Sequence, residues 1–96
     1  MRYYSLWYYS RQKNIFAKLK KNNYLIELGN KIREARKAKG LSQEQLALQA
    51  EVDRSYVGGI ERGERNVSFL TLVKIATCLG CDIAKLTIGI PNDRSR

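Results

Sequence analysis

The sequence predicts an all-α fold of five short helices, and three observations lead to this prediction. Apolar residues recur every three or four positions, which is the spacing of one face of a helix. Serine or aspartate precedes most of these stretches and glycine follows them, as at helix starts and ends. No stretch has the pattern of a strand, and the chain contains one proline. At 96 residues, the chain has the length of a single domain.

The first helix is predicted over residues 26–39. Basic side chains surround its apolar stripe, and Gly40 supplies the left-handed residue that ends it. The stripe consists of Leu25, Leu28, Ile32, Ala35 and Ala38.

The second helix is predicted over residues 43–50. Ser42 and Gln45 form a capping box at its start, in which the serine hydroxyl accepts a free N–H of the helix and the glutamine side chain reaches back. Leu46 and Ala47 face inward, and the small Ala47 lets another helix approach closely.

The third helix is predicted over residues 54–62, with Asp53 as a strong N-cap and Gly63 as its stop. Gly58 and Gly59 lie inside it, and each costs roughly 1 kcal/mol relative to alanine. Either the two glycines are tolerated at an exposed site, or bare backbone lets the helix lie close against a surface. The second interpretation is preferred.

The fourth helix is predicted over residues 69–79, with Ser68 as its cap and Gly80 as its stop. Asp82 caps a short fifth helix, and Pro91 ends regular structure. The apolar positions of these two helices are Leu72, Val73, Ile75, Ala76, Leu79, Ile83 and Leu86.

Three segments follow from this pattern: a basic, aromatic N-terminal arm over residues 1–23, a helical domain over 24–91, and a frayed tail over 92–96. Part of the arm could form an amphipathic helix, or the arm could become ordered only on binding. Residues 1–40 hold eleven basic and two acidic side chains, whereas 41–96 hold seven of each, so the formal charge of +9 lies near the N-terminus. Such a patch favours nucleic acid as the partner, with a membrane surface or no partner as alternatives.

Composition argues against several classes of protein. The chain has no apolar run long enough to span a membrane and begins as a poor signal peptide, so we expect a cytoplasmic, nucleoid-associated protein. It has no histidine and no paired carboxylates, so we expect neither an enzyme nor a cofactor. Cys78 and Cys81 are too few to complete a zinc site and are interpreted as small core residues. A four-thiolate site shared across a dimer is the alternative.

The two short helices, 43–50 and 54–62, and the tight turn between them have the spacing of a helix-turn-helix. In this motif the second helix enters the major groove of DNA and the first crosses above the backbone. Spacing alone does not separate the motif from other helix pairs in a bundle.

A run of residues in one register adds to this interpretation. From about Leu28 to Leu86 the chain resembles the lambda-repressor-like domain of the XRE family of bacterial and phage regulators. Within the family, the segment 53–62 with the pair at 65–66 is similar to the controller proteins of restriction-modification systems, although other members share the motif. The residues that carry the resemblance are Leu28-Gly29, Ile32-Arg33-x-x-Arg36, Gly40-Leu41-Ser42-Gln43-Glu44-x-Leu46-Ala47, Ser55-Tyr56-Val57-x-x-Ile60-Glu61-Arg62-Gly63-x-Arg65-Asn66 and Leu72-x-x-Ile75-Ala76.

The resemblance implies that Arg54 and Ser55 contact base edges. A guanidinium group suits this task because its fork matches O6 and N7 of guanine. A solvated first-turn arginine is the alternative for Arg54. Many relatives place a polar side chain where this chain has Gly58 and Gly59, so base readout would concentrate on Arg54, Ser55 and DNA shape.

Other positions are implied to contact the DNA backbone. Gln43 matches a family position that binds a phosphate through its amide and the helix N-terminus. Tyr56 would either donate its hydroxyl to a phosphate or only pack. Arg65 and Asn66 resemble a pair that clamps the backbone in controller proteins, with solvated loop residues as the alternative.

Arg36 and Glu61 resemble the family's ion pair between the first helix and the recognition helix. If buried, such a pair fixes the angle between the helices, and if exposed it contributes little.

These features together predict a homodimeric, autoregulatory transcription regulator of the controller type on a pseudo-palindromic operator in double-stranded DNA. Leu86, Ile88 and Ile90 are the expected dimer interface, because a small monomer would leave them poorly covered. A prophage-type repressor is one alternative. An antitoxin that binds a toxin through residues 1–23 and also binds its own operator is the other.

Overall fold

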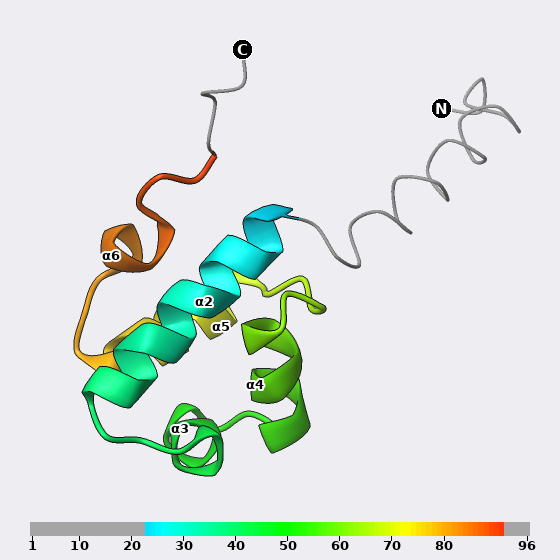
Figure 1. The fold of residues 1–96 in the computed structure, drawn as a ribbon. Coiled ribbons are helices and arrows are strands. Elements are labelled where there is room, and N and C mark those ends of the chain that lie inside the picture. The colour runs from blue at the N-terminus through cyan, green and yellow to red at the C-terminus, as the bar shows by residue number, and fades with distance from the viewer. Residues whose placement is uncertain (1–22, 92–96) are drawn as a thin grey trace, which may run out of the picture.

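The structure is a computed structural model that describes residues 23–91 of the chain. This part contains five helices and no strand, so the all-α prediction is confirmed for it (Figure 1). The helices are α2 (Asn23–Ala38), α3 (Gln43–Ala50), α4 (Arg54–Glu61), α5 (Phe69–Leu79) and α6 (Ile83–Thr87).

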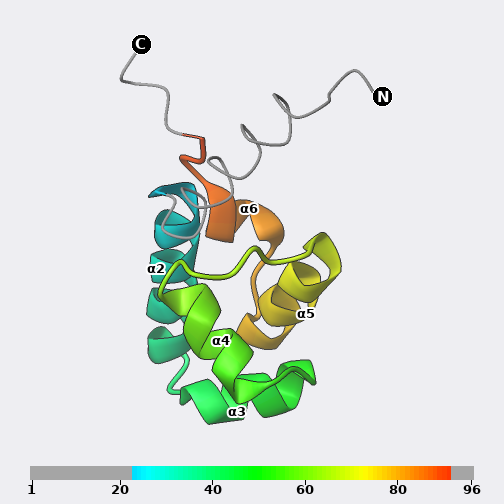
Figure 2. The same cartoon turned by 90° about the vertical axis from the view of Figure 1, so that its right-hand side faces the viewer.

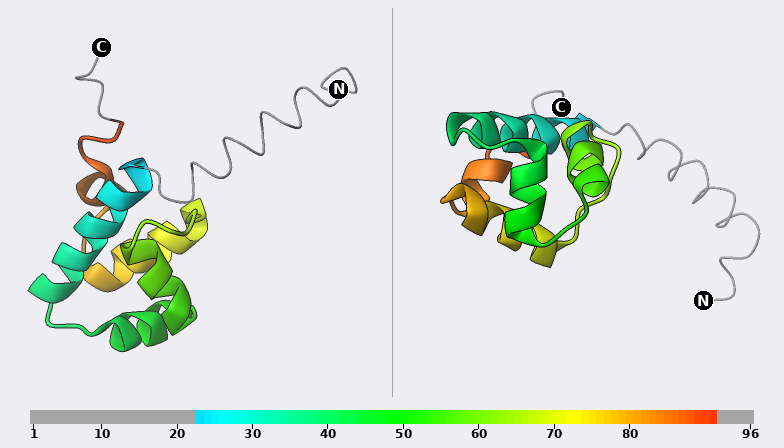
Figure 3. Two further views of the ribbon diagram at one scale, coloured as in Figure 1. Left: turned by 45° about the vertical axis from the view of Figure 1, so that its right-hand side comes forward. Right: turned by 90° about the horizontal axis from the view of Figure 1, so that it is seen from below.

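The long helix α2 organises the bundle. Helices α4 and α6 pack on either side of it, and α5 contacts both α3 and α6. Figure 2 shows α3 and α6 at opposite ends of the bundle. Figure 3 shows the chain passing from α3 through a short turn into α4, on the side of the bundle away from α6. The helix-turn-helix pair therefore occupies one end and one side of the domain.

The core lies where the apolar stripes of the five helices meet. Side chains from every helix are buried in it, and the capping residues expected at Ser42, Ser68 and Asp82 all accept a backbone N–H bond. The buried apolar residues are Leu28, Ile32, Leu46, Ala47, Ala50, Val57, Ile60, Leu72, Ile75, Ala76, Leu79 and Leu86.

Leu86 requires a correction to the expected dimer interface. Its side chain is completely buried within the chain's own core, because α6 folds back against α2 and α5. Ile90 is half-buried and packs on the same core. Of the three residues expected at the interface, only Ile88 presents a large exposed apolar side chain, at 69% exposure.

Helix boundaries agree with the predictions to within one residue for α3, α4 and α5, and α6 begins directly after the predicted cap Asp82, whereas α2 begins three residues before the predicted start. Contact of Ile26 with the backbone at Gly63 accompanies this longer helix. Gly63 has φ +76°, and a Cβ atom built on it would lie 2.8 Å from the Ile26 Cα atom. Only glycine fits such a left-handed residue packed against a helix backbone.

The predicted arm and tail lie outside the described residues, except that Asn23 is the first residue of α2. The possible amphipathic helix in the arm therefore stays a prediction. Within residues 23–91, no helix combines the length and apolar character that crossing a membrane requires.

Candidate nucleic-acid interface

The start of α3 is fixed by the predicted capping box. The Gln45 N–H donates to the Ser42 hydroxyl oxygen at 3.0 Å, and the Ser42 N–H donates to the Gln45 side-chain oxygen at 2.8 Å. At the other end of α3, Glu51 adopts a left-handed conformation with φ 59°. The Val52 N–H donates to the Ala47 carbonyl at 2.9 Å. These bonds define both ends of the first helix of the pair.

Helix α4 begins where predicted, but its cap differs in detail. Asp53 occupies the N-cap position without accepting a backbone N–H through its side chain. The Ser55 hydroxyl donates to the Asp53 carboxylate at 3.3 Å instead. The prediction of Asp53 as the N-cap is therefore right in position, but the side-chain bond to the helix backbone that makes such a cap strong is not formed.

Arg54 and Ser55 are both exposed on the first turn of α4. No hydrogen bond or ion pair joins the Arg54 side chain to another part of residues 23–91, and the residue is exposed. The Ser55 hydroxyl, although donating to Asp53, retains its lone pairs as acceptors. This turn can therefore present one cationic fork and one hydroxyl to the edges of base pairs.

The far end of α4 is held by a buried ion pair. Arg36 on α2 donates to Glu61 twice, from Nε to Oε2 at 2.7 Å and from Nη2 to Oε1 at 3.0 Å. The third donor of the fork, Nη1, donates to the Leu41 carbonyl at 2.8 Å. Both side chains are buried, with Glu61 only 1% exposed. A bidentate contact of this kind fixes both the distance and the angle between two helices.

The environment of Glu61 sets its charge. Burial alone would raise the pKa of the Glu61 carboxyl, but hydrogen bonds from Arg36 and Gln43 and the charge of Arg36 together lower it below the ordinary value. The bond with Glu61 also raises the pKa of Arg36. Both groups are therefore charged at neutral pH.

Two further side chains reach the same carboxylate. Gln43 at the start of α3 donates from Nε2 to Glu61 Oε1 at 2.9 Å, which joins α3 to the end of α4. The second N–H of that amide remains for another acceptor, such as a phosphate. Arg33 approaches Glu61 at 3.5 Å and is 40% exposed. Sequence reasoning did not include Arg33 in this group, although its place one helix turn before Arg36 puts both on one face of α2.

Helix α2 also meets α4 by direct backbone contact. A Cβ atom on Gly29 would overlap the Ile60 carbonyl oxygen and lie 2.6 Å from the Glu61 carbonyl oxygen. Since these are backbone atoms, no side-chain rotation can make room. Gly29 therefore sets how closely α2 and the recognition helix approach, about two helical turns before Arg36 of the ion pair.

Gly58 and Gly59 are buried, so the interpretation that they are tolerated at an exposed site is wrong. Side chains from elsewhere cover them. Arg62 Nη1 lies 3.1 Å from the position of a Gly58 Cβ, and Arg65 Cγ lies 2.7 Å from that of a Gly59 Cβ. The guanidinium carbon of Arg65 lies 5.7 Å from the centre of the Tyr56 ring.

The loop after α4 is exposed at Arg65 and Asn66, the predicted clamping pair. Tyr56 is half-buried and packs on the core, which fits a packing role and leaves its hydroxyl role a prediction. Arg62, which sequence reasoning did not single out, is exposed and forms an ion pair with Glu64 at 3.1 Å. Exposed guanidinium groups thus lie at the start of α4, at its end and in the following loop.

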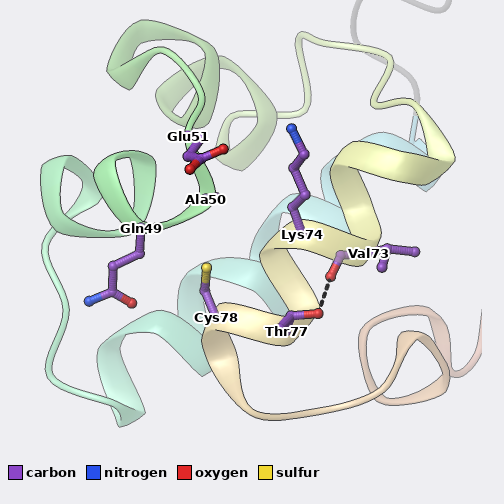
Figure 4. A pocket seen from close by; sticks show the side chains of 7 residues that line it. All are labelled: Gln49, Ala50, Glu51, Val73, Lys74, Thr77 and Cys78. Carbon is purple, nitrogen blue, oxygen red and sulfur yellow. Dashed lines mark hydrogen bonds between the residues drawn. The ribbon is translucent and has the colours of Figure 1, made fainter.

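The described residues offer little support for a different kind of site. A pocket of about 230 Å³ lies between the end of α3 and α5, with Glu51 and Lys74 on opposite walls (Figure 4). The Thr77 hydroxyl beside it donates to the Val73 carbonyl of its own helix at 2.8 Å. Burial raises the pKa of the Cys78 thiol in the same wall, which disfavours the nucleophilic thiolate.

Cys78 and Cys81 are free thiols, half-buried against the core, in keeping with the interpretation of both as core residues. In residues 23–91, no three potential ligands gather closely enough to hold a metal ion.

Comparison with known proteins gives a consistent result. Residues 32–86 match the family model HTH_3, described as helix-turn-helix. The control protein C.MunI from Mycoplasma sp. is 46% identical over 73 residues, which cover 75% of this chain and 99% of that protein. The crystal structure of the restriction-modification controller protein C.AhdI from Aeromonas hydrophila superimposes with a TM-score of 0.64 and 53% identity, over 65% of this chain and 94% of that one.

A phage protein also matches, over a smaller part of its own length. The immunity repressor protein of Bacillus phage phi105 is 39% identical over 61 residues, which cover 64% of this chain and 42% of that protein. The similarity therefore covers nearly all of C.MunI and C.AhdI but less than half of this repressor.

Proposed function

Because this chain belongs to the HTH_3 helix-turn-helix family of DNA-binding regulators, and not to a family of enzymes, we propose that it is a sequence-specific transcription regulator of the controller type. It would bind a pseudo-palindromic operator as a homodimer, regulate its own promoter and act in the cytoplasm. The observation that carries the proposal is the exposed first turn of α4, which presents Arg54 and Ser55 while the C-terminal end of the helix is fixed to the rest of the domain.

The lengths of the relatives favour a controller over a prophage-type repressor. The alignment covers 99% of C.MunI and 94% of C.AhdI, so the size of those proteins corresponds to the helical domain of this chain. The phi105 repressor has a further 58% of its length outside the alignment, from 100% minus the 42% that is covered. The resemblance therefore extends to the whole of a control protein but only to a part of the repressor.

The roles of the other site residues follow from their positions. Gln43 would use its second amide N–H and the start of α3 to bind a phosphate on one side of the groove. Arg65 and Asn66 would contact phosphates on the other side. In a dimer, two α4 helices about 34 Å apart would enter successive major grooves on one face of the duplex.

Replacement of Arg54 by alanine tests base readout. Binding to the duplex that the wild-type protein enriches from a randomised pool should weaken by about 1–3 kcal/mol, and the preference at one base pair should relax. Binding to random duplexes should weaken much less, because the lost contact is to a base. Fluorescence anisotropy with both duplexes measures the difference, and Lys85→Ala on the distant α6 is the matched control, expected to leave both affinities unchanged. An equal loss on all sequences would make Arg54 a phosphate contact.

The dimer is tested at Ile88. Replacing this exposed residue by aspartate should weaken self-association about tenfold or more, because an apolar contact is lost and a charge would be buried. Analytical ultracentrifugation measures the dissociation constant. Leu48→Asp is the control, since Leu48 is 79% exposed on α3 at the other end of the bundle. If Leu48→Asp separates the subunits and Ile88→Asp does not, the interface lies elsewhere.

A further inference from the structure

The outer surface of the recognition helix has an unusual construction. Its fifth and sixth residues, Gly58 and Gly59, are glycines, although α4 is regular there and neither glycine has a positive φ. Glycine lowers the stability of a helix relative to alanine, so backbone conformation does not account for the pair. What the two positions share is a side chain from outside the helix lying directly on the backbone.

Gly59 is covered more closely than Gly58, and by a different part of the covering side chain. A Cβ on Gly59 would lie 2.7 Å from Cγ, 3.3 Å from Nε and 3.5 Å from Cδ of Arg65. A Cβ on Gly58 would meet only the far ends of Arg62 and Gln43, at 3.1 and 3.5 Å. The Arg65 side chain therefore lies along the helix over Gly59, and an added methyl group would displace it near its base.

Tyr56 supplies the other contact of Arg65. It precedes Gly59 by three residues, so the two share one face of α4. The Arg65 guanidinium carbon lies 5.7 Å from the centre of the Tyr56 ring, within the range of a cation–π contact. Two contacts thus hold the exposed loop residue Arg65. Its aliphatic carbons lie on the Gly59 backbone, and its guanidinium group lies over the Tyr56 ring.

We propose that Gly59 is a positioning residue for DNA binding, because its bare backbone seats Arg65 along the recognition helix with the guanidinium over Tyr56. The inference rests on the proposed function, in which Arg65 contacts a phosphate. These contacts restrict the rotamers of Arg65 in the free protein, which reduces the conformational entropy that is lost on DNA binding. In this arrangement Tyr56 acts by holding Arg65.

The test is a double-mutant cycle of Gly59→Ala and Arg65→Ala on a duplex that the wild-type protein enriches from a randomised pool. Each single variant should bind about tenfold more weakly, with a shallower dependence of affinity on salt, by a slope of about 0.9, because one phosphate contact is lost. The double variant should bind no more weakly than Arg65→Ala alone. The melting temperature of Gly59→Ala should stay close to that of the wild type, because the preference of alanine for the helix offsets the displacement of the exposed Arg65 side chain.

Gly58→Ala is the matched control, since it adds the same methyl group to the same helix and meets only flexible ends. A second readout needs no DNA: the NMR resonance of the Arg65 Nε–H group should shift in Gly59→Ala and in Tyr56→Leu, and stay in place in Gly58→Ala.

Several results would overturn the inference. If Gly59→Ala binds the duplex as tightly as the wild type, the position of Arg65 over Gly59 does not contribute to binding. If Gly59→Ala lowers the affinity for the duplex by the same factor in the Arg65→Ala background as in the wild type, the methyl group obstructs the duplex directly and does not act through Arg65. If the wild-type protein enriches no duplex at all, the proposed function itself fails, and the inference fails with it.

Discussion

Replacing Arg36 by methionine is expected to lower the free energy of unfolding by about 3–5 kcal/mol, the usual cost of removing one partner from a buried ion pair. The change leaves the fully buried Glu61 carboxylate without both hydrogen bonds from its cationic partner and the Leu41 carbonyl without its donor. Gln43 and the more distant Arg33 are the remaining contacts of that carboxylate. Urea unfolding followed by circular dichroism measures the loss.

Arg33→Met is the matched control for this prediction. It removes an arginine from the same face of α2 and from the same carboxylate, but that arginine is 40% exposed and 3.5 Å away. Exposed ion pairs contribute about 0–1 kcal/mol, so its effect should be several times smaller. Equal losses in the two variants would show that burial of the Arg36 contact is not what matters.

The pH dependence of unfolding gives an independent check on the pair. The pKa of Glu61 is lowered in the folded state, so the stability it contributes is present above the ordinary glutamate pKa and is lost as the pH falls towards the folded value. In Arg36→Met, burial should instead raise that pKa, because it outweighs the remaining contacts. The deficit of the variant should therefore shrink as the pH falls, and a deficit that is constant with pH would contradict this account.

Gly29→Ala is expected to destabilise the domain by about 3 kcal/mol, at the upper end of the range for overpacking. The added methyl group would collide with the carbonyl oxygens of Ile60 and Glu61, which belong to the backbone of α4. Relief requires α2 and α4 to move apart, which would also stretch the Arg36–Glu61 pair. DNA binding should weaken as well, because the position of the recognition helix changes.

Gly58→Ala provides the comparison for Gly29→Ala. Both glycines are buried in helices, but the Gly58 methyl group would meet only the ends of two flexible side chains. Because alanine favours the helix by up to about 1 kcal/mol, Gly58→Ala should be neutral or slightly stabilising. The melting temperature should thus fall in Gly29→Ala and stay unchanged or rise slightly in Gly58→Ala. A similar loss in both would assign the effect to a general intolerance of buried glycine replacement.

Local signals in the sequence were sufficient to predict most of the fold. The capping box of Ser42 and Gln45 and the serine cap of Ser68 are interactions between residues three apart, so they can be recognised without knowing the rest of the molecule. The longer start of α2 could not be predicted in this way. Ile26 in its first turn packs against Gly63. The two residues are 37 positions apart in the sequence, and only the tertiary structure brings them together.

In the candidate site too, features set by local sequence could be predicted, whereas features set by contacts between separate elements could not. Arg54 and Ser55 were predicted as base contacts from the motif; both are exposed on the first turn of α4, and their contact with bases stays a prediction. The convergence of Gln43 and Arg33 on Glu61, and the burial of Gly58 and Gly59 under Arg62 and Arg65, depend on side chains from separate elements. Leu86 was placed on the surface for a related reason. Apolar character alone does not say whether a short terminal helix folds onto its own core or awaits a second subunit.

The anchoring of α4 at one end has an evolutionary consequence. The contacts that hold this helix involve Gly29, Arg36 and the inward residues Val57, Ile60 and Glu61. Arg54 and Ser55 take no part in them, so under the proposed function mutations at these two positions would alter which operator is bound while folding remains intact. Under that function, relatives with this scaffold would reach new target sites by changing very few codons.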